Sequence, residues 1–193
     1  MKIVVVGTGY VGLVGGTCFA ETGHDVVCVD IDEAKVAKMK SGVIPIFEPG
    51  LSVLFERNTK NGRLSFTTEL AKAVEDAEIV FLALPTPPGA DGSADLSYVL
   101  GVAKDLSKII TKYTVIVDKS TVPVGTAEKV EALLLENLDK SLFDVVSNPE
   151  FLREGVAVDD FLKPDRVVIG TSSDRARQTM ERLYQPFVRQ GNP

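Results

Sequence analysis

The chain has 193 residues, of which 45% are hydrophobic and 25% are charged, and its formal net charge is −6. This composition is that of an ordinary globular protein and suffices for one domain. The negative charge argues against a nucleic-acid or anionic-membrane partner, and no apolar run approaches the roughly 20 residues of a membrane span. We therefore expect a single-domain cytoplasmic protein.

The cysteines and the histidine form no pattern typical of a metal site. Cys18 falls in the first expected helix and Cys28 in the second expected strand, so both are predicted to be small buried side chains in a reducing compartment. One histidine and two cysteines cannot assemble a typical zinc site. We therefore predict no bound metal.

The first thirty residues carry the first strong pattern. An apolar run at residues 3–6 leads into the sequence Gly7-Thr8-Gly9-Tyr10-Val11-Gly12. In a strand–turn–helix unit, Gly7 permits the tight turn, Gly9 lets a pyrophosphate approach the backbone, and Gly12 lets the helix lie against the sheet. The helix N-terminus then offers free N–H groups to the phosphates. The pattern predicts a dinucleotide-binding turn in which Tyr10 and Val11 also contact the cofactor.

Asp30 completes this pattern at the end of a second apolar run, residues 26–29. A carboxylate at this place accepts hydrogen bonds from the ribose hydroxyls of the adenosine and repels a 2′-phosphate. Because no arginine follows Asp30 to reverse that preference, we predict that the cofactor is NAD rather than NADP.

The rest of the chain alternates expected strands with expected helices. The strands are predicted at residues 64–67, 79–84, 115–117, 143–146 and 167–169. The helices are predicted at 32–41, with Asp32 as the N-cap, and at 51–55, 69–74, 95–110, 125–138 and 174–187. This alternation with right-handed crossovers predicts an α/β fold of the Rossmann type. We expect a doubly wound, mostly parallel sheet with helices on both faces and the strand order 3-2-1-4-5-6 for the first six strands.

Polar loops follow the fourth, fifth and sixth expected strands, at residues 85–92, 118–123 and 147–155. Ligands of open α/β sheets bind outside the carboxyl ends of the strands, so these loops are candidate site segments. Thr86 in the first loop is expected to contact the cofactor. The stretch 43–61 is explained on its pattern alone by packing.

Six motifs spread along the chain resemble those of the nucleotide-sugar dehydrogenases, and among these the UDP-glucose 6-dehydrogenases most of all. They are Gly7–Gly12, Phe47–Leu51, Asp91–Asp95, Lys119–Thr126, Asn148–Gly155 and Pro164–Gly170. The resemblance implies oxidation of the sugar C6 alcohol to a carboxylate with two NAD⁺, through a thiohemiacetal and a thioester on a cysteine. It also implies a UDP-sugar substrate and a homodimer in the full-length protein.

The resemblance implies roles for further residues. Lys35 reaches the adenosine side of the cofactor, Ser120 lies beside the cofactor, and Thr121 positions a water in the active site. Glu150 is a candidate acid or base acting on that water or on the C6 hydroxyl.

Residues 151–154 are implied to contact the sugar nucleotide, and Glu154 also the cofactor. They are Phe151, Leu152, Arg153 and Glu154. Arg153 either holds the diphosphate or pairs with a neighbouring carboxylate. If the segment begins a helix, Glu150 and Glu154 share one of its faces.

In the family, the catalytic cysteine, lysine, asparagine and aspartate lie in a central helix and a second domain beyond residue 193. The resemblance therefore implies that residues 1–193 are an NAD-binding Rossmann domain that is inactive alone. Two alternatives stay open. One is a dehydrogenase for GDP-mannose or a UDP-N-acetylhexosamine, and the other is a stand-alone NAD-sensing module.

Overall fold

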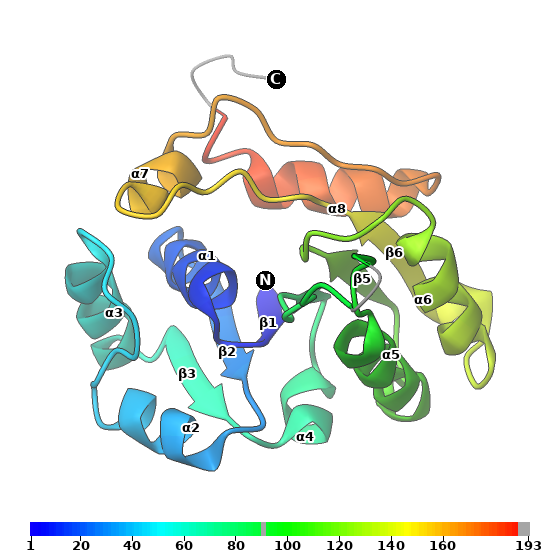
Figure 1. The fold of residues 1–193 in the computed structure, drawn as a ribbon, viewed down its shortest axis with the longest axis horizontal. Coiled ribbons are helices and arrows are strands. Elements are labelled where there is room, and N and C mark those ends of the chain that lie inside the picture. The colour runs from blue at the N-terminus through cyan, green and yellow to red at the C-terminus, as the bar shows by residue number, and fades with distance from the viewer. Residues whose placement is uncertain (90–91, 189–193) are drawn as a thin grey trace.

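The computed structural model describes residues 1–89 and 92–188, and in these it shows a parallel sheet between two layers of helices (Figure 1). The strands are β1 (Lys2–Val6), β2 (Asp25–Val29), β3 (Leu64–Thr67), β4 (Ile79–Leu82), β5 (Thr114–Asp118) and β6 (Phe143–Ser147). Their order is β3-β2-β1-β4-β5-β6, and every neighbouring pair is parallel. The predicted Rossmann-type fold and strand order are confirmed.

The helices divide between the two faces of the sheet. They are α1 (Tyr10–Glu21), α2 (Glu33–Lys40), α3 (Leu51–Lys60), α4 (Leu70–Val74), α5 (Ser97–Ile109), α6 (Thr126–Leu135), α7 (Ala157–Leu162) and α8 (Asp174–Tyr184), with a 3₁₀ turn at Lys140–Leu142. Core residues of α1, α2, α3, α7 and α8 share one cluster, whereas those of α4, α5 and α6 share the other. The chain therefore crosses the sheet between β3 and β4, as a doubly wound fold requires.

Strand β1 shows why the apolar runs are uninterrupted. Ile3 and Val5 belong to the cluster beneath α1, whereas Val4 and Val6 belong to the cluster beneath α5. A strand that is buried on both faces has no solvent side on which a polar residue could alternate. The sheet consequently forms a rigid base, and the segments at the carboxyl ends of its strands carry the polar residues.

The expected strand at Val167–Ile169 is wrong. Only an isolated antiparallel bridge joins Ser147 to Gly170 here, and the side-chain amide of Asn148 donates to Val168 O at 2.8 Å. A side chain thus occupies the carbonyl that a seventh strand would have offered to β6. The short helix α7 was not expected from the sequence.

The helix boundaries follow local signals where these exist. The carboxylate of Asp32 accepts from Lys35 N at 2.9 Å, which confirms it as the N-cap of α2. The loop predicted at residues 85–92 lies partly outside the described residues, because these exclude 90 and 91. Within the described ranges, no helix is both long and apolar enough to cross a bilayer.

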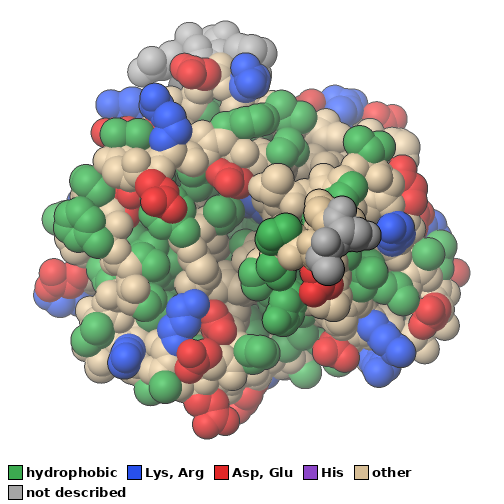
Figure 2. All heavy atoms as spheres, viewed as in Figure 1, with side chains coloured by type: hydrophobic (Ala, Val, Ile, Leu, Met, Phe, Trp, Pro, Cys, Tyr) green, Lys and Arg blue, Asp and Glu red, His purple; other side chains and the backbone are tan. Residues whose placement is uncertain are grey.

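Figure 2 shows acidic and basic side chains interspersed over the visible face. Neither sign gathers into one large field on that face. On that face, selective attraction of a charged ligand would come from individually placed groups rather than from a field of one sign.

Candidate functional site

The turn between β1 and α1 has two glycines that the protein itself requires. Gly7 has φ +98°, and a Cβ on it would lie 2.3 Å from Ala83 O. A Cβ on Gly12 would lie 2.0 Å from Gly7 O. No side chain larger than hydrogen fits at either position, so the turn can pass close beneath β4.

Gly9 is different, because a Cβ there would meet no atom of the protein within 4 Å. As the N-cap of α1, Gly9 supplies no side-chain hydrogen bond, and the first turn of the helix contains no acidic residue. The N–H groups of that turn therefore face an open space, and no acidic side chain of the described residues is recorded as their partner. This cradle fits a pyrophosphate, which would occupy the room that the missing Cβ leaves.

Asp30 follows β2 and faces the same turn. It accepts hydrogen bonds from Thr8 N and Lys35 Nζ, both at 3.0 Å, from Asp32 N at 3.1 Å, and from the Thr8 hydroxyl. Burial raises the pKa of the Asp30 carboxyl, but the hydrogen bonds from Thr8, Asp32 and Lys35 outweigh it and hold the pKa below its ordinary value. The group is thus an ionised acceptor, as ribose binding requires.

An open cleft of about 690 Å³ runs from Asp30 to the ends of β4 and β5, and we call it the central cleft. Of the residues predicted to bind the cofactor, it is lined by Gly7, Gly9, Tyr10, Val11, Asp30, Lys35, Thr86, Ser120 and Thr121. Glu150 lines it too, whereas Gly12 and Glu154 do not. Gly12 is buried behind the turn, so its part is to let α1 approach the sheet.

The loops after β4 and β5 are joined by hydroxyl groups. Thr86 donates to Thr121 O at 2.9 Å, while Ser120 Oγ accepts from Leu84 N at 3.1 Å and lies 2.9 Å from Leu84 O. These bonds hold Thr86, Ser120 and Thr121 together on one wall of the central cleft. Ser120 therefore has a structural task whether or not it touches a ligand.

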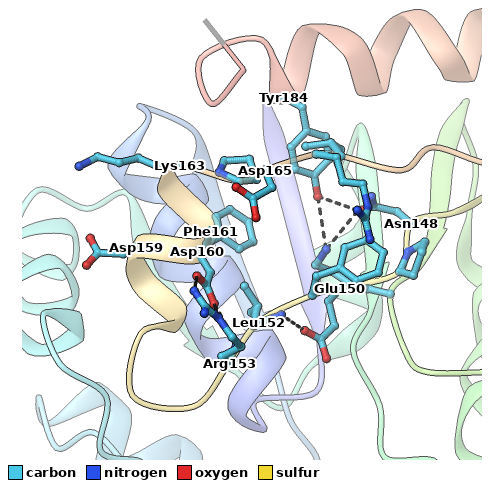
Figure 3. A pocket seen from close by; sticks show the side chains of 16 residues that line it. Asn148, Glu150, Leu152, Arg153, Asp159, Asp160, Phe161, Lys163, Asp165 and Tyr184 are labelled. Carbon is cyan, nitrogen blue, oxygen red and sulfur yellow. Dashed lines mark hydrogen bonds and ion pairs between the residues drawn. The ribbon is translucent and has the colours of Figure 1, made fainter. Parts of the chain in front are cut away.

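A second, smaller cavity of about 480 Å³ adjoins the loop after β6, and we call it the side pocket (Figure 3). Its lining includes Glu150, Phe151, Leu152 and Arg153, all of which were predicted to contact substrate. Glu150 and Lys119 line both this pocket and the central cleft. A group held in the side pocket and a ligand in the cleft would therefore meet at Glu150.

Lys119 is a member of the site that sequence reasoning missed. It is buried, with Nζ 3.2 Å from Asn148 Oδ1 and 3.4 Å from the Tyr184 hydroxyl. Burial lowers the pKa of the Lys119 ammonium to about 8, and the charge of nearby Glu150 opposes that shift. In the sequence, Lys119 could have been recognised as a candidate site residue because it directly follows a strand that is buried throughout.

The segment 150–154 is not helical, so the shared helical face of Glu150 and Glu154 is wrong. Leu152 N donates to Glu150 Oε2 at 2.6 Å, and Gly155 adopts φ +90°. A side chain that bonds the backbone two residues on favours a turn over a helix. Glu154 consequently projects from a turn, and its predicted ligand contact stays a prediction.

Arg153 pairs with a neighbouring carboxylate in this structure. Its Nε and Nη2 lie 3.0 and 2.7 Å from the two oxygens of Asp160, and its own N–H also donates to Asp160. Of the two roles considered for Arg153, the geometry favours this ion pair over a free diphosphate clamp.

Glu48 is the second residue that sequence reasoning missed. Its buried carboxylate accepts from Gly155 N at 2.8 Å, from Ala157 N at 2.7 Å and from the Tyr10 hydroxyl. The surrounding stretch had been ascribed to packing alone. The signal that could have found Glu48 is an acidic residue inside an otherwise apolar segment.

Metal chemistry has no visible support in the described part of the chain. There, no group of three or more His, Cys, Asp or Glu side chains is close enough to hold an ion. Cys18 and Cys28 are both free and buried, and burial raises the pKa of each thiol to about 12. Neither is an accessible thiolate.

Comparison with known proteins agrees with this geometry. The model of the UDP-glucose/GDP-mannose dehydrogenase family, NAD binding domain, matches residues 1–188. A UDP-glucose 6-dehydrogenase from Rhizobium meliloti is 52% identical over 196 residues, which cover 100% of this chain and 45% of the relative.

Two solved structures share the fold closely. A UDP-glucose dehydrogenase from Pyrobaculum islandicum has a TM-score of 0.92 and 42% identity, covering 96% of this chain and 44% of the other. A GDP-mannose dehydrogenase from Pseudomonas aeruginosa, solved as a ternary complex, has a TM-score of 0.92 and 35% identity with the same coverage of both chains. The chain thus spans less than half the length of these relatives.

Proposed function

Because this chain belongs to the UDP-glucose/GDP-mannose dehydrogenase family and matches its NAD-binding domain, we propose that it is the cofactor half of a UDP-glucose 6-dehydrogenase. The whole protein would oxidise the C6 alcohol of UDP-glucose to the carboxylate with two NAD⁺. The observation that carries the proposal is the position of Glu150, which lines both the central cleft and the side pocket.

The cofactor supplies a hydride acceptor in the central cleft, and the residues of this chain prepare the site around it. The turn at Gly7–Gly12 binds the pyrophosphate, while Asp30 and Lys35 hold the adenosine ribose. Glu150 acts as acid or base on the C6 hydroxyl or on a water, and Thr121 positions that water.

Glucose is favoured over other sugars by the degree of similarity. Among the solved structures, identity is 42% to the UDP-glucose dehydrogenase of Pyrobaculum islandicum but 35% to the GDP-mannose dehydrogenase. We infer from the family resemblance that the nucleophilic cysteine and the helix of a homodimer would lie outside residues 1–193. The chain alone is therefore proposed to bind cofactor without turning over sugar.

Calorimetry with NAD⁺ and NADP⁺ tests the cofactor site. NAD⁺ should bind at least about tenfold more tightly, since a 2′-phosphate would meet the carboxylate of Asp30. Asp30→Ala should weaken NAD⁺ binding, whereas the matched control Asp25→Ala, at the other and exposed end of β2, should not. Equal affinities for the two cofactors would refute the assignment of Asp30.

A second measurement tests the division of the reaction. UDP-glucose and NAD⁺ added to this chain should yield no NADH above background absorbance at 340 nm, a wavelength that reports NADH directly. Steady turnover would mean that the nucleophile lies within residues 1–193, and the proposed role of this half would then be wrong.

A further inference from the structure

Glu48 lies in the segment between α2 and α3, which forms neither helix nor strand. Only 4% of Glu48 is exposed, whereas its neighbour Phe47 is 89% exposed. This reverses the usual order, in which an aromatic side chain is buried and a carboxylate is solvated. Burial of a charge at the expense of an apolar neighbour indicates that the carboxylate has a specific task.

The carboxylate is satisfied by donors from two distant parts of the chain. Gly155 N and the Tyr10 hydroxyl donate to Oε2, and Ala157 N donates to Oε1. Burial raises the pKa of the Glu48 carboxyl, but the hydrogen bonds from Tyr10 and the backbone outweigh it, and the pKa lies below its ordinary value. Burial and the charge of Glu48 raise the pKa of Tyr10 to about 12, so its hydroxyl keeps its proton and donates.

The hydrogen-bond partners of Glu48 lie in two parts of the site, the phosphate-binding turn and the loop that carries Glu150. Tyr10 is the first residue of α1 and lines the central cleft beside Gly9. Gly155 and Ala157 stand at the far end of the loop that carries Glu150. Glu48 therefore joins the phosphate-binding turn to the candidate catalytic loop through a single carboxylate.

Apart from Asn148 N, which donates to Asp118 O at the start of the loop, the other backbone N–H groups of the loop bond locally. Leu152 N donates to Glu150, Arg153 N to Asp160 and Val156 N to Arg153 O. The bonds to Glu48, in contrast, span 107 and 109 residues. Glu48 consequently fixes where this end of the loop lies relative to α1, whereas the local bonds fix only its shape.

We propose that Glu48 is a positioning residue that couples cofactor binding in the central cleft to the loop carrying Glu150. A pyrophosphate bound at the N–H groups of the first turn of α1 fixes that turn and with it Tyr10. The fixed Tyr10 hydroxyl holds the Glu48 carboxylate, which in turn holds Gly155 and Ala157. The cofactor thereby orders the loop that carries Glu150. This coupling rests on the proposed function, because NAD⁺ is the ligand that occupies the cleft.

Hydrogen exchange of the backbone amides, measured by NMR without cofactor, tests the hold on the loop. In Glu48→Gln, the amides of Gly155 and Ala157 should exchange at least about tenfold faster, because a neutral amide is a weaker acceptor than a carboxylate. Amides of β1 report whether the fold is intact. The control Glu56→Gln, an exposed residue on α3, should change neither set. Unchanged exchange at Gly155 and Ala157 in Glu48→Gln would overturn the proposal.

Tyr10→Phe tests the coupling itself, because it removes only the hydroxyl and leaves both backbone bonds to Glu48. In the wild-type chain, saturating NAD⁺ should slow exchange at Gly155 and Ala157 by about tenfold. At an NAD⁺ concentration that saturates the variant, Tyr10→Phe should lose most of that slowing, which a purely structural role of Glu48 would not predict. The same slowing in wild type and Tyr10→Phe would refute the coupling.

The two measurements separate this inference from the proposed function. If the wild-type chain binds no NAD⁺, the proposed function fails and the coupling fails with it. The cofactor-free exchange of Glu48→Gln still decides whether Glu48 holds the loop. If NAD⁺ binds but does not slow exchange at Gly155 and Ala157, the coupling alone is wrong.

Discussion

The turn at residues 7–12 and the loop at residues 148–157 lie in the same site but are held in opposite ways. The turn depends on missing side chains, since Gly7 and Gly12 have no room for a Cβ. The loop depends on side chains from elsewhere, with Glu48 bonded at one end and the Asn148–Tyr184 contact at the other. The residues that shape the turn are therefore neighbours in the sequence, whereas the residues that hold the loop are far apart in it.

Gly12→Ala should have the largest effect on stability, and it tests whether the turn tolerates a side chain. A Cβ 2.0 Å from Gly7 O forces α1 away from the sheet, so we expect a loss of about 4 kcal/mol or more in unfolding free energy. Urea unfolding measures it. Gly101→Ala is the matched control, since Gly101 lies within α5 with no atom within 4 Å of the added Cβ, and alanine there should be neutral or stabilising. A folded, cofactor-binding Gly12→Ala chain would contradict the account of the turn.

Gly9→Ala should weaken cofactor binding without weakening the fold. Because the added Cβ meets no protein atom, the urea midpoint should stay within error of wild type. The same Cβ occupies the space of the pyrophosphate, so NAD⁺ affinity should fall by about 100-fold. Calorimetry measures the NAD⁺ affinity and urea unfolding measures the midpoint, both on the same preparation. Unimpaired NAD⁺ binding would show that the pyrophosphate lies elsewhere.

Asp118→Asn should stabilise the protein in a pH-dependent way. Asp118 ends β5, and its carbonyl oxygen accepts a hydrogen bond from Asn148 N at the start of the loop. Burial raises the pKa of the Asp118 carboxyl from 3.8 to about 6, and its Oδ2 is buried without a hydrogen-bond partner among the described residues. The fold therefore favours the neutral form. The cost of ionisation is absent below pH 3.8 and complete above about pH 6.

Asparagine imitates the neutral carboxyl, so Asp118→Asn should raise the unfolding free energy at pH 7.5 by about 2 kcal/mol. The gain should vanish as the pH falls below 4. Thermal unfolding at both pH values measures it. A gain that is equal at both would show that ionisation of Asp118 is not its source.

Gly155→Ala should have the smallest effect on stability, and it tests whether the loop tolerates a side chain where the turn does not. Its φ of +90° strains an alanine, but the added Cβ meets no atom within 4 Å. We expect a loss of only about 1 kcal/mol in unfolding free energy. A loss as large as that of Gly12→Ala would mean that the loop is as intolerant of side chains as the turn.

The same contrast explains what could be predicted from the sequence. Strand β3 was placed at its observed bounds, and the Asp32 cap of α2 was recognised, because hydrophobic runs and caps are local signals. Helix α7 was missed because its six residues are too few to show a period. The expected strand at 167–169 failed because an apolar run does not reveal that Asn148 takes one of its carbonyls.

For the site, the glycines of the first turn and Asp30 could be predicted as cofactor residues, because their spacing is fixed by one turn and one strand. Glu48 and Lys119 could not, since each acquires its role only when partners 29 or more residues away arrive. The neighbouring sequence marks each of them only as a charged residue beside apolar ones, and it does not reveal which distant groups the side chain contacts. The family resemblance indicated which segments mattered, but the structure was needed to show what these two side chains touch.

The bond between Glu48 and Gly155 also bears on the order in which the protein is made. A ribosome completes the phosphate-binding turn and releases Glu48 long before residue 155 is synthesised, because the two are 107 residues apart. Until then the carboxylate has only water and Tyr10 as partners. Contacts of such long sequence separation form late in folding, since closing the intervening chain costs entropy. In the nascent chain, the phosphate-binding turn would therefore be complete before the loop that carries Glu150 is secured.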